Sequence, residues 1–164
     1  MARTDSQNPL LPSLLDRLID TDPLTTTEPA WRQAQSLREY EASVLRDLEQ
    51  LLNNRQPRPD MAEEESELRK SVYTYGMPEF SSTGVGSSQD REKLRRAVEE
   101  TIISFEPRLR DVRVTLHEPT DNYDRTLRLT VDGLLWLDPT PVPVTFDTLV
   151  QPTSGQCVVK PRSS

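Results

Sequence analysis

The sequence LRRAVEETIISFEPRLRDVRVTLH, residues 94–117, begins with the apolar spacing of a helix and ends with that of a strand. Apolar residues in its first half recur every three to four positions and so form one face of an α-helix: Leu94, Val98, Ile102 and Phe105. Pro107 lacks a backbone donor and restricts the residue before it, so the helix is predicted to make its last turn over Ser104–Glu106. From Val112 to His117 apolar and polar residues alternate, which predicts a β-strand.

A second alternating run, Leu127–Asp132, follows a polar loop at Glu118–Asp124. The two runs together predict an antiparallel hairpin with one face on a core and the other in water. Beyond Gly133 the run Leu134–Leu137 is apolar on both faces. Either Gly133 marks a bulge that resets the alternation, or this end of the strand is covered on both sides.

The alternating pattern continues toward the C-terminus. Residues Val142–Val150 predict a third strand, in which Pro143 marks a sheet edge or the start of the strand. Residues 156–160 are a candidate for a short fourth strand.

Helical signals precede the strands. The strongest is an amphipathic helix that ends near Asn53 and whose apolar residues keep helical spacing: Leu37, Tyr40, Val44, Leu45, Leu48, Leu51 and Leu52. A short helix is predicted over residues 62–73, and Ser88 is the expected N-cap of the helix that reaches Phe105. Residues 9–19 hold a leucine stripe too short to be stable alone, so it docks either on its own domain or on a partner.

Helices that come first and a small sheet that comes last predict the α+β class. We expect amphipathic helices in the N-terminal part, packed on a small antiparallel sheet of three to four strands. Residues 20–30 have the composition of a linker. The chain is therefore expected to consist of an N-terminal extension with a short docking helix, residues 1–36, and one domain, residues 37–164.

The composition narrows the classes of function. The 164 residues carry a net charge of −7, which argues against nucleic acid as a main partner because binding phosphates needs clustered Lys and Arg. The first residues do not resemble a secretory signal, and apolar runs stay well below the ~20 residues that span a bilayer. We therefore expect a cytoplasmic protein without membrane insertion. The single Cys157 excludes an internal disulfide.

Residues that could carry chemistry are sparse. His117 and Cys157 are the only soft metal ligands and lack partners at ligand spacing, so neither a metal nor another cofactor is expected. A nucleophilic triad needs a base, and His117 is the only histidine, while no serine stands in a nucleophile-elbow sequence, so such a triad is not expected. A pair of carboxylates that includes Glu106 is the enzymatic alternative, but Arg108 would keep Glu106 ionised and make it a poor general acid. No catalytic residue is assigned.

Three segments in order resemble a known family: SVYTYGMPEF at residues 71–80, FEPRL at 105–109, and the hairpin that follows at once. Upstream, LLDRL at residues 14–18 and LLNNR at 51–55 also fit. The chain resembles the lysozyme-like sheath-initiator family, which includes the TssE subunits of type VI secretion systems and a baseplate wedge protein of phage T4. The likeness covers roughly residues 10–160, although the tract 24–34 matches no family motif.

The resemblance implies a structural role in the baseplate of a contractile injection machine. Wedge subunits of the TssF, TssG and TssK type and sheath subunits of the TssB and TssC type would be the partners. In this family the triplet Glu106, Pro107 and Arg108 would project as a rigid knob that docks into the helical core bundle of neighbouring wedge subunits. The alternatives are that the two charges merely cap their own helix and, at the level of function, that the protein is a muramidase.

The resemblance also implies that sheath strands add to an edge of the sheet. The segment Val142–Val150 carries one charge, Asp147, so it is expected to be an open edge, with apolar surface beside it. The residues assigned to this strand addition are Leu134, Trp136, Val144, Phe146 and Thr148. If residues 156–160 instead fold back and close this edge, the strand at Val112–Leu116 becomes the candidate.

Overall fold

The protein is described here from a computed structural model. The described residues are 10, 13–14, 18, 37–56, 71–79, 87–117, 126–138, 140–151 and 155–162. They contain two α-helices, α2 (Leu37–Asn53) and α3 (Ser88–Phe105), and a 3-10 helix, η4 (Val72–Thr74). The strands β1 (Leu109–His117), β2 (Leu127–Leu135), β3 (Val142–Val150) and β4 (Cys157–Pro161) follow. The predicted α+β class is confirmed.

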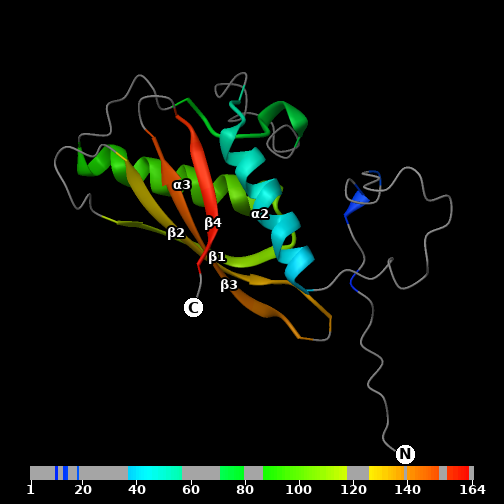
Figure 1. The fold of residues 1–164 in the computed structure, drawn as a ribbon. Helices are drawn as coiled ribbons and strands as arrows, with labels where there is room; N and C mark the ends of the chain where they lie inside the picture. The colour runs from blue at the N-terminus through cyan, green and yellow to red at the C-terminus, as the bar shows by residue number, and fades with distance from the viewer. Residues whose placement is uncertain are drawn as a thin grey trace, which may run out of the picture.

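The two helices pack on the sheet as the apolar spacing predicts. Helix α3 lies against β1 and crosses the strands, and α2 lies against β4 (Figure 1). One core joins the helices to the sheet and includes Val44, Leu48, Leu52, Leu94, Val98, Ile102, Leu129, Val131, Leu135, Phe146 and Val159. Helix α3 ends at Phe105 as predicted, but its N-cap is Ser87 rather than Ser88, because the Ser87 hydroxyl accepts the backbone N–H of Asp90 at 3.1 Å.

The sheet is an antiparallel meander in the order β1-β2-β3-β4. The predicted hairpin is present, and both of its strands extend beyond the alternating runs, to Leu109 and to Leu135. The irregularity expected at Gly133 lies on the opposite strand, as a bulge in β1 between Arg110 and Arg113. Because the extra residue belongs to β1, the alternation of β2 is not reset and Leu135 remains in the core.

The expectation that β3 is an open edge of the sheet is wrong, because β4 pairs with it. The β4 residues Cys157–Pro161 pair with Phe146–Val150 of β3, so most of the third strand is interior to the sheet. Phe146 and Thr148 are only 3% and 1% exposed and face the core rather than a free edge. The lack of charges along this strand reflects its coverage by the chain's own last strand.

The end of α2 holds the start of β4. The side-chain amide of Asn53 donates to the Cys157 carbonyl at 2.8 Å, and its oxygen accepts the Cys157 N–H at 2.9 Å. Cys157 itself is buried, and this burial raises the pKa of its thiol to about 11. Helix α2 is thus joined to β4, the last of the described strands.

The segment around Gly76 anchors the loop between the two helices. Met77 is buried and donates its N–H to the Asn54 carbonyl at 2.8 Å, while its own carbonyl accepts the Gln56 N–H at 3.0 Å. Gly76 has a φ of +112°, and a β-carbon there would lie 2.6 Å from the Asn54 oxygen. Only glycine fits this conformation and this approach.

Parts of the sequence prediction cannot be compared with the structure. The helix expected at 62–73 lies mostly outside the described residues, and η4 occupies its described end. The loop at Glu118–Asp124 is also outside them. Of the leucine stripe at 9–19, Leu10, Leu14 and Leu18 are described. Leu10 is partly exposed, and Leu14 and Leu18 are 74% and 73% exposed.

We predict that Gly76→Ala lowers the free energy of unfolding by roughly 2 kcal/mol or more, because it adds a clash to an unfavourable φ. Gly133→Ala is the matched control. Its new β-carbon would lie 3.4 Å from the Arg110 oxygen, an ordinary contact, so the change should stay within about 1 kcal/mol. Urea unfolding of both variants measures the difference, and equal stabilities would contradict the role given to Gly76.

A second prediction concerns the buried Thr148, whose hydroxyl has no hydrogen-bond partner among the described residues. Thr148→Val should raise the free energy of unfolding by about 1 kcal/mol, because it removes an unsatisfied polar group at similar volume. The control is Thr130→Val. The Thr130 hydroxyl bonds both His117 (2.7 Å) and Asp147 (3.1 Å), so its loss should destabilise the fold. Chemical denaturation distinguishes the two, and a destabilised Thr148→Val variant would refute the expectation.

Candidate functional site

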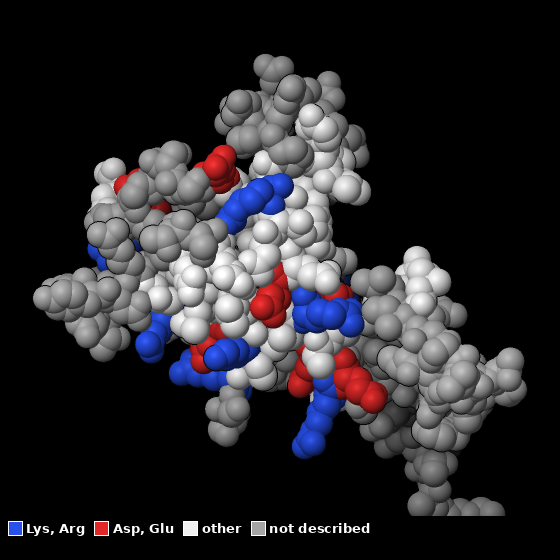
Figure 2. All heavy atoms as spheres, turned by 45° about the horizontal axis from the view of Figure 1, so that its top comes forward, with Lys and Arg blue, Asp and Glu red and all other residues white. Residues whose placement is uncertain are grey.

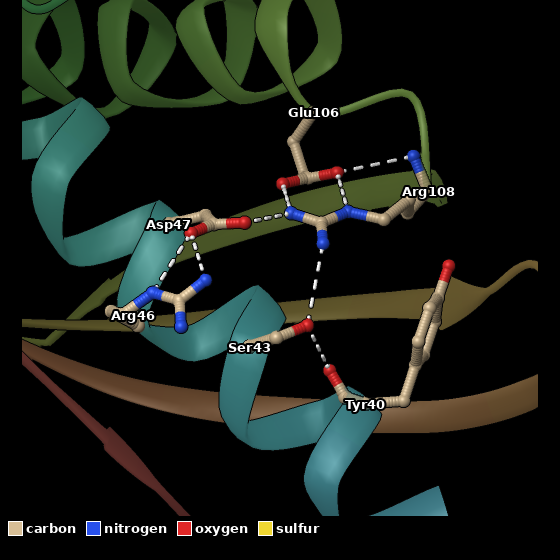
Figure 3. Close-up of polar contacts among 6 residues, drawn as sticks. All are labelled: Tyr40, Ser43, Arg46, Asp47, Glu106 and Arg108. Atoms are coloured by element: carbon tan, nitrogen blue, oxygen red, sulfur yellow. Dashed lines mark hydrogen bonds and ion pairs between the residues drawn. The ribbon is translucent and has the colours of Figure 1, made fainter. Parts of the chain in front are cut away.

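The candidate site is a charge network at the turn between α3 and β1. Figure 3 shows the Arg108 guanidinium pointing from this turn toward α2, with Glu106 on one side and Asp47 on the other. Its Nε and Nη2 atoms donate to the two Glu106 carboxylate oxygens at 2.6 and 2.5 Å, a bidentate pair. Nη2 also donates to Asp47 at 2.7 Å. Arg108 therefore joins the end of one helix to the middle of the other.

Helix α2 supplies the rest of the network. The Ser43 hydroxyl accepts a long hydrogen bond, 3.4 Å, from Arg108 and donates to the Tyr40 carbonyl at 2.9 Å. The guanidinium also lies over the Tyr40 ring, 6.0 Å from its centre. Arg46 pairs with the other oxygen of Asp47 at 3.0 Å. Ser43 and Asp47 lie four residues apart, so both face Arg108 from successive turns of the helix.

The network stabilises a buried carboxylate, that of Glu106, whose burial without a partner would destabilise the fold. Glu106 is 4% exposed and is the C-cap of α3, where the helix dipole disfavours negative charge. Burial disfavours the charged form of Arg108, but its hydrogen bonds and ion pairs with Glu106 and Asp47 outweigh this and raise its pKa. Burial also raises the pKa of Tyr40, with Arg108 opposing this and Glu106 adding to it. The contacts with the two carboxylates thus keep Arg108 in its charged form.

This arrangement corrects the expectation of a knob with two projecting charges. Glu106 is buried and Arg108 is partly buried, and both bond within the chain. Pro107 is the exposed residue of the triplet. The charges cap and bridge their own helices, which was the alternative, since Arg108 bonds Glu106 at the end of α3 and Asp47 on α2.

Sequence reasoning missed Asp47 and Ser43. The pairing of Asp47 with Arg108 spans 61 positions, which no local pattern reveals. A signal did exist, because Tyr40, Ser43 and Asp47 follow helical spacing and form a polar border to the apolar face of α2.

The residues assigned to sheath binding are not brought together. Trp136 is 50% exposed, and the Arg110 guanidinium stacks on its ring at 3.7 Å. Leu134 lies on the same outer face of β2 and is partly exposed, whereas Val144 packs against the core on the opposite face of the sheet. Phe146 and Thr148 are inside the core. Leu134 and Trp136 therefore remain as surface residues of this set.

The chemistry available at the network is limited by Arg108. Glu106 is buried and both of its carboxylate oxygens already accept hydrogen bonds from Arg108, so this carboxylate is not presented to a substrate. The described residues contain no cluster of three or more His, Cys, Asp or Glu able to hold a metal ion. The site is built to fix the angle between two helices and a strand.

The described surface mixes charges of both signs. Figure 2 shows Lys and Arg side chains next to Asp and Glu side chains, so that the visible face has no broad area of one charge. Within the described residues, no helix is long and apolar enough to cross a membrane.

Comparison with known proteins gives two matches. The profile of a family described as "Baseplate wedge protein gp25" matches residues 38–140, a range that contains α2 except its first residue, the charge network, β1 and β2. A solved structure titled "The baseplate complex from the type VI secretion system" contains a chain that is 17% identical, with a TM-score of 0.49, over 70% of this chain and 96% of that one. The comparison with curated proteins gives no significant match.

We predict that Arg108→Ala lowers the free energy of unfolding by about 3–5 kcal/mol, because it leaves the Glu106 carboxylate buried without its partner. The control is Arg113→Ala, which removes an exposed guanidinium from the neighbouring strand and should change stability by less than about 0.5 kcal/mol. Urea unfolding followed by circular dichroism measures both. A stable Arg108→Ala variant would mean that the network does not support the fold.

Proposed function

The chain belongs to the baseplate wedge protein gp25 family, and within the structural baseplate role of that family we propose that it is the sheath-initiating wedge subunit of a type VI secretion system. The observation that carries the proposal is the family match over residues 38–140. The type VI assignment rests on the motifs at residues 14–18, 71–80 and 105–109. We propose that the protein acts in the cytoplasm, without catalysis, metal or other cofactor.

We propose that wedge subunits of the TssF, TssG and TssK type contact the turn at Pro107. Its exposed ring stands between two residues that the charge network fixes in place. Pro107 restricts the backbone, and the Arg108 N–H donates to the Glu106 side chain at 3.2 Å. A turn held in this way loses little conformational freedom on binding, which favours affinity. In this proposal Glu106 and Arg108 do not contact the wedge subunits directly but hold the turn in the shape that binds them.

Sheath subunits of the TssB and TssC type would bind at the sheet. Trp136 with its stacked Arg110 is the kind of residue pair that concentrates binding energy in interfaces. Leu134, near the end of β2, extends this apolar surface. Residues 1–36, whose described Leu14 and Leu18 are exposed, would form an extension outside the domain at residues 37–164.

The proposal predicts which proteins the tagged chain recovers from cells. Affinity purification followed by mass spectrometry should recover baseplate wedge and sheath subunits. Pro107→Glu should weaken wedge binding at least tenfold, because it places a charge in the contact, and Pro143→Glu, at an exposed proline of β3, should leave wedge binding unchanged. Recovery of neither class of subunit by the unmodified chain would refute the proposed function. Equal wedge binding by the two variants would refute only the contact at Pro107.

A further inference from the structure

A groove opens where the first turns of α2 pass the start of β3 (Figure 1). Its volume is about 600 Å³. The α2 wall consists of four residues with the i, i+3, i+4, i+7 spacing of one helix face: Arg38, Glu41, Ala42 and Leu45. The floor includes Val144 and Phe146, on the side of the sheet that the helices cover. The described helices therefore leave part of this side of the sheet accessible.

The groove exposes apolar surface that continues the core. Leu45 and Val144 pack against core residues but are themselves only partly buried. Between them on the α2 wall Ala42 is exposed, and its small side chain allows the backbone of a neighbouring element to approach closely. An apolar side chain placed against these three residues would be removed from water on several sides.

The edge of the sheet beside the groove is unsuited to a further strand. The Arg162 N–H donates to the Thr145 carbonyl at 3.1 Å, so the backbone groups of Thr145 point toward the β4 side. Two residues earlier Pro143 points the same way and has no N–H to donate. A helix needs no such donor, because its backbone bonds are internal. The wall on α2 and the edge of β3 together therefore favour a helical occupant.

The same chain holds a segment of the right pattern. Five leucines of residues 9–19 form one stripe at helical spacing: Leu10, Leu11, Leu14, Leu15 and Leu18. Asp16 and Asp20 fall on the opposite side of such a helix. Leu14 and Leu18 have helical backbone and are mostly exposed in the structure. Because a helix of this length is not stable in isolation, it gains stability by docking.

The leucine stripe and the α2 wall match in length. On a helix the distance from Leu10 to Leu18 is about 12 Å, and that from Arg38 to Leu45 is about 11 Å. The tether between stripe and domain, residues 19–36, ends next to α2, and the groove begins at the second residue of α2. Fully extended, this tether reaches about 60 Å, so it spans the groove easily. A tether of this size gives the stripe a roughly millimolar effective concentration, so that even weak docking is populated within the chain.

We propose that residues 9–19 dock as a short helix in the groove between α2 and β3 of their own chain, as a third helix on the sheet. The leucines face Ala42, Leu45 and Val144, and the two aspartates face water. Leu14 and Leu18 are undocked in the structure, so docking is a second arrangement of the same chain. The inference goes beyond the proposed function and does not depend on it, because it rests on the groove, the stripe and the tether of this chain alone.

The direct test is to measure nuclear Overhauser effects between methyl groups of the full-length protein. The Ala42 methyl should give cross-peaks to leucine methyls of residues 10–18. Leu14→Asp combined with Leu18→Asp should abolish these cross-peaks, because a charge is unfavourable in an apolar groove. The control, Leu24→Asp, makes the same substitution in the tether and should preserve them.

Two outcomes of this measurement would overturn the proposal. One is the absence of these cross-peaks in the unmodified protein. The other is cross-peaks that arise only between differently labelled copies in a mixed sample, which would assign the groove to the stripe of a second copy.

Trypsin cleavage after Arg17 provides an independent test. Ala42→Asp should speed this cleavage roughly fivefold or more, because the protease cuts the segment only while it is undocked. Gln50→Asp introduces the same charge at an exposed position of α2 outside the groove and should leave the rate unchanged. The double variant at Leu14 and Leu18, which leaves the groove intact, should cleave as fast as Ala42→Asp.

Circular dichroism checks that all variants keep the fold. Equal cleavage rates in the unmodified protein and in both groups of docking variants would contradict docking within the chain. Protection of Arg17 that appears only after wedge or sheath subunits are added would assign the stripe to a partner and overturn the proposal, while the proposed function would stand.

Discussion

The bridge from Arg108 to Glu106 and Asp47 is the contact on which the arrangement of the domain depends. It joins the C-terminal end of α3, the first residues of β1 and the middle of α2 through one guanidinium. A buried carboxylate at a helix C-terminus is unfavourable unless a cation accompanies it, so the network and the turn at Pro107 require each other. The edge ring contact of Tyr75 with Phe105, 5.4 Å between centres, supports the same corner from the loop side.

The elements with a strong local period were predictable from the sequence. The apolar spacing of α2 and α3 and the alternation in β1, β2 and β3 reflect burial on one side, which is a local property. The N-cap was misplaced by one residue because Ser87 and Ser88 are chemically equivalent and only backbone geometry distinguishes them. Gly133 marked an irregularity, but the extra residue belongs to the strand opposite it.

The candidate site was less predictable, because it depends on contacts between distant segments. The triplet Glu106, Pro107 and Arg108 stood out in the sequence, yet its burial follows from Asp47 and Ser43 on another helix. The open edge expected at β3 was wrong for the same reason. A strand without charges can pair with a strand of another molecule or with a strand of its own chain. The sequence of β3 fits both, and only the observed pairing with β4 shows that the second applies.

The link between Asn53 and Cys157 has a consequence for synthesis on the ribosome. These residues lie 104 positions apart, and they join α2 to β4. The meander can grow hairpin by hairpin as the chain emerges, because each strand pairs with its neighbour in sequence. Helix α2, although made first, obtains its full set of neighbours only when β4 has left the exit tunnel. Until then the Cys157 thiol lacks this cover, so its shielding marks the closure of β4 on α2.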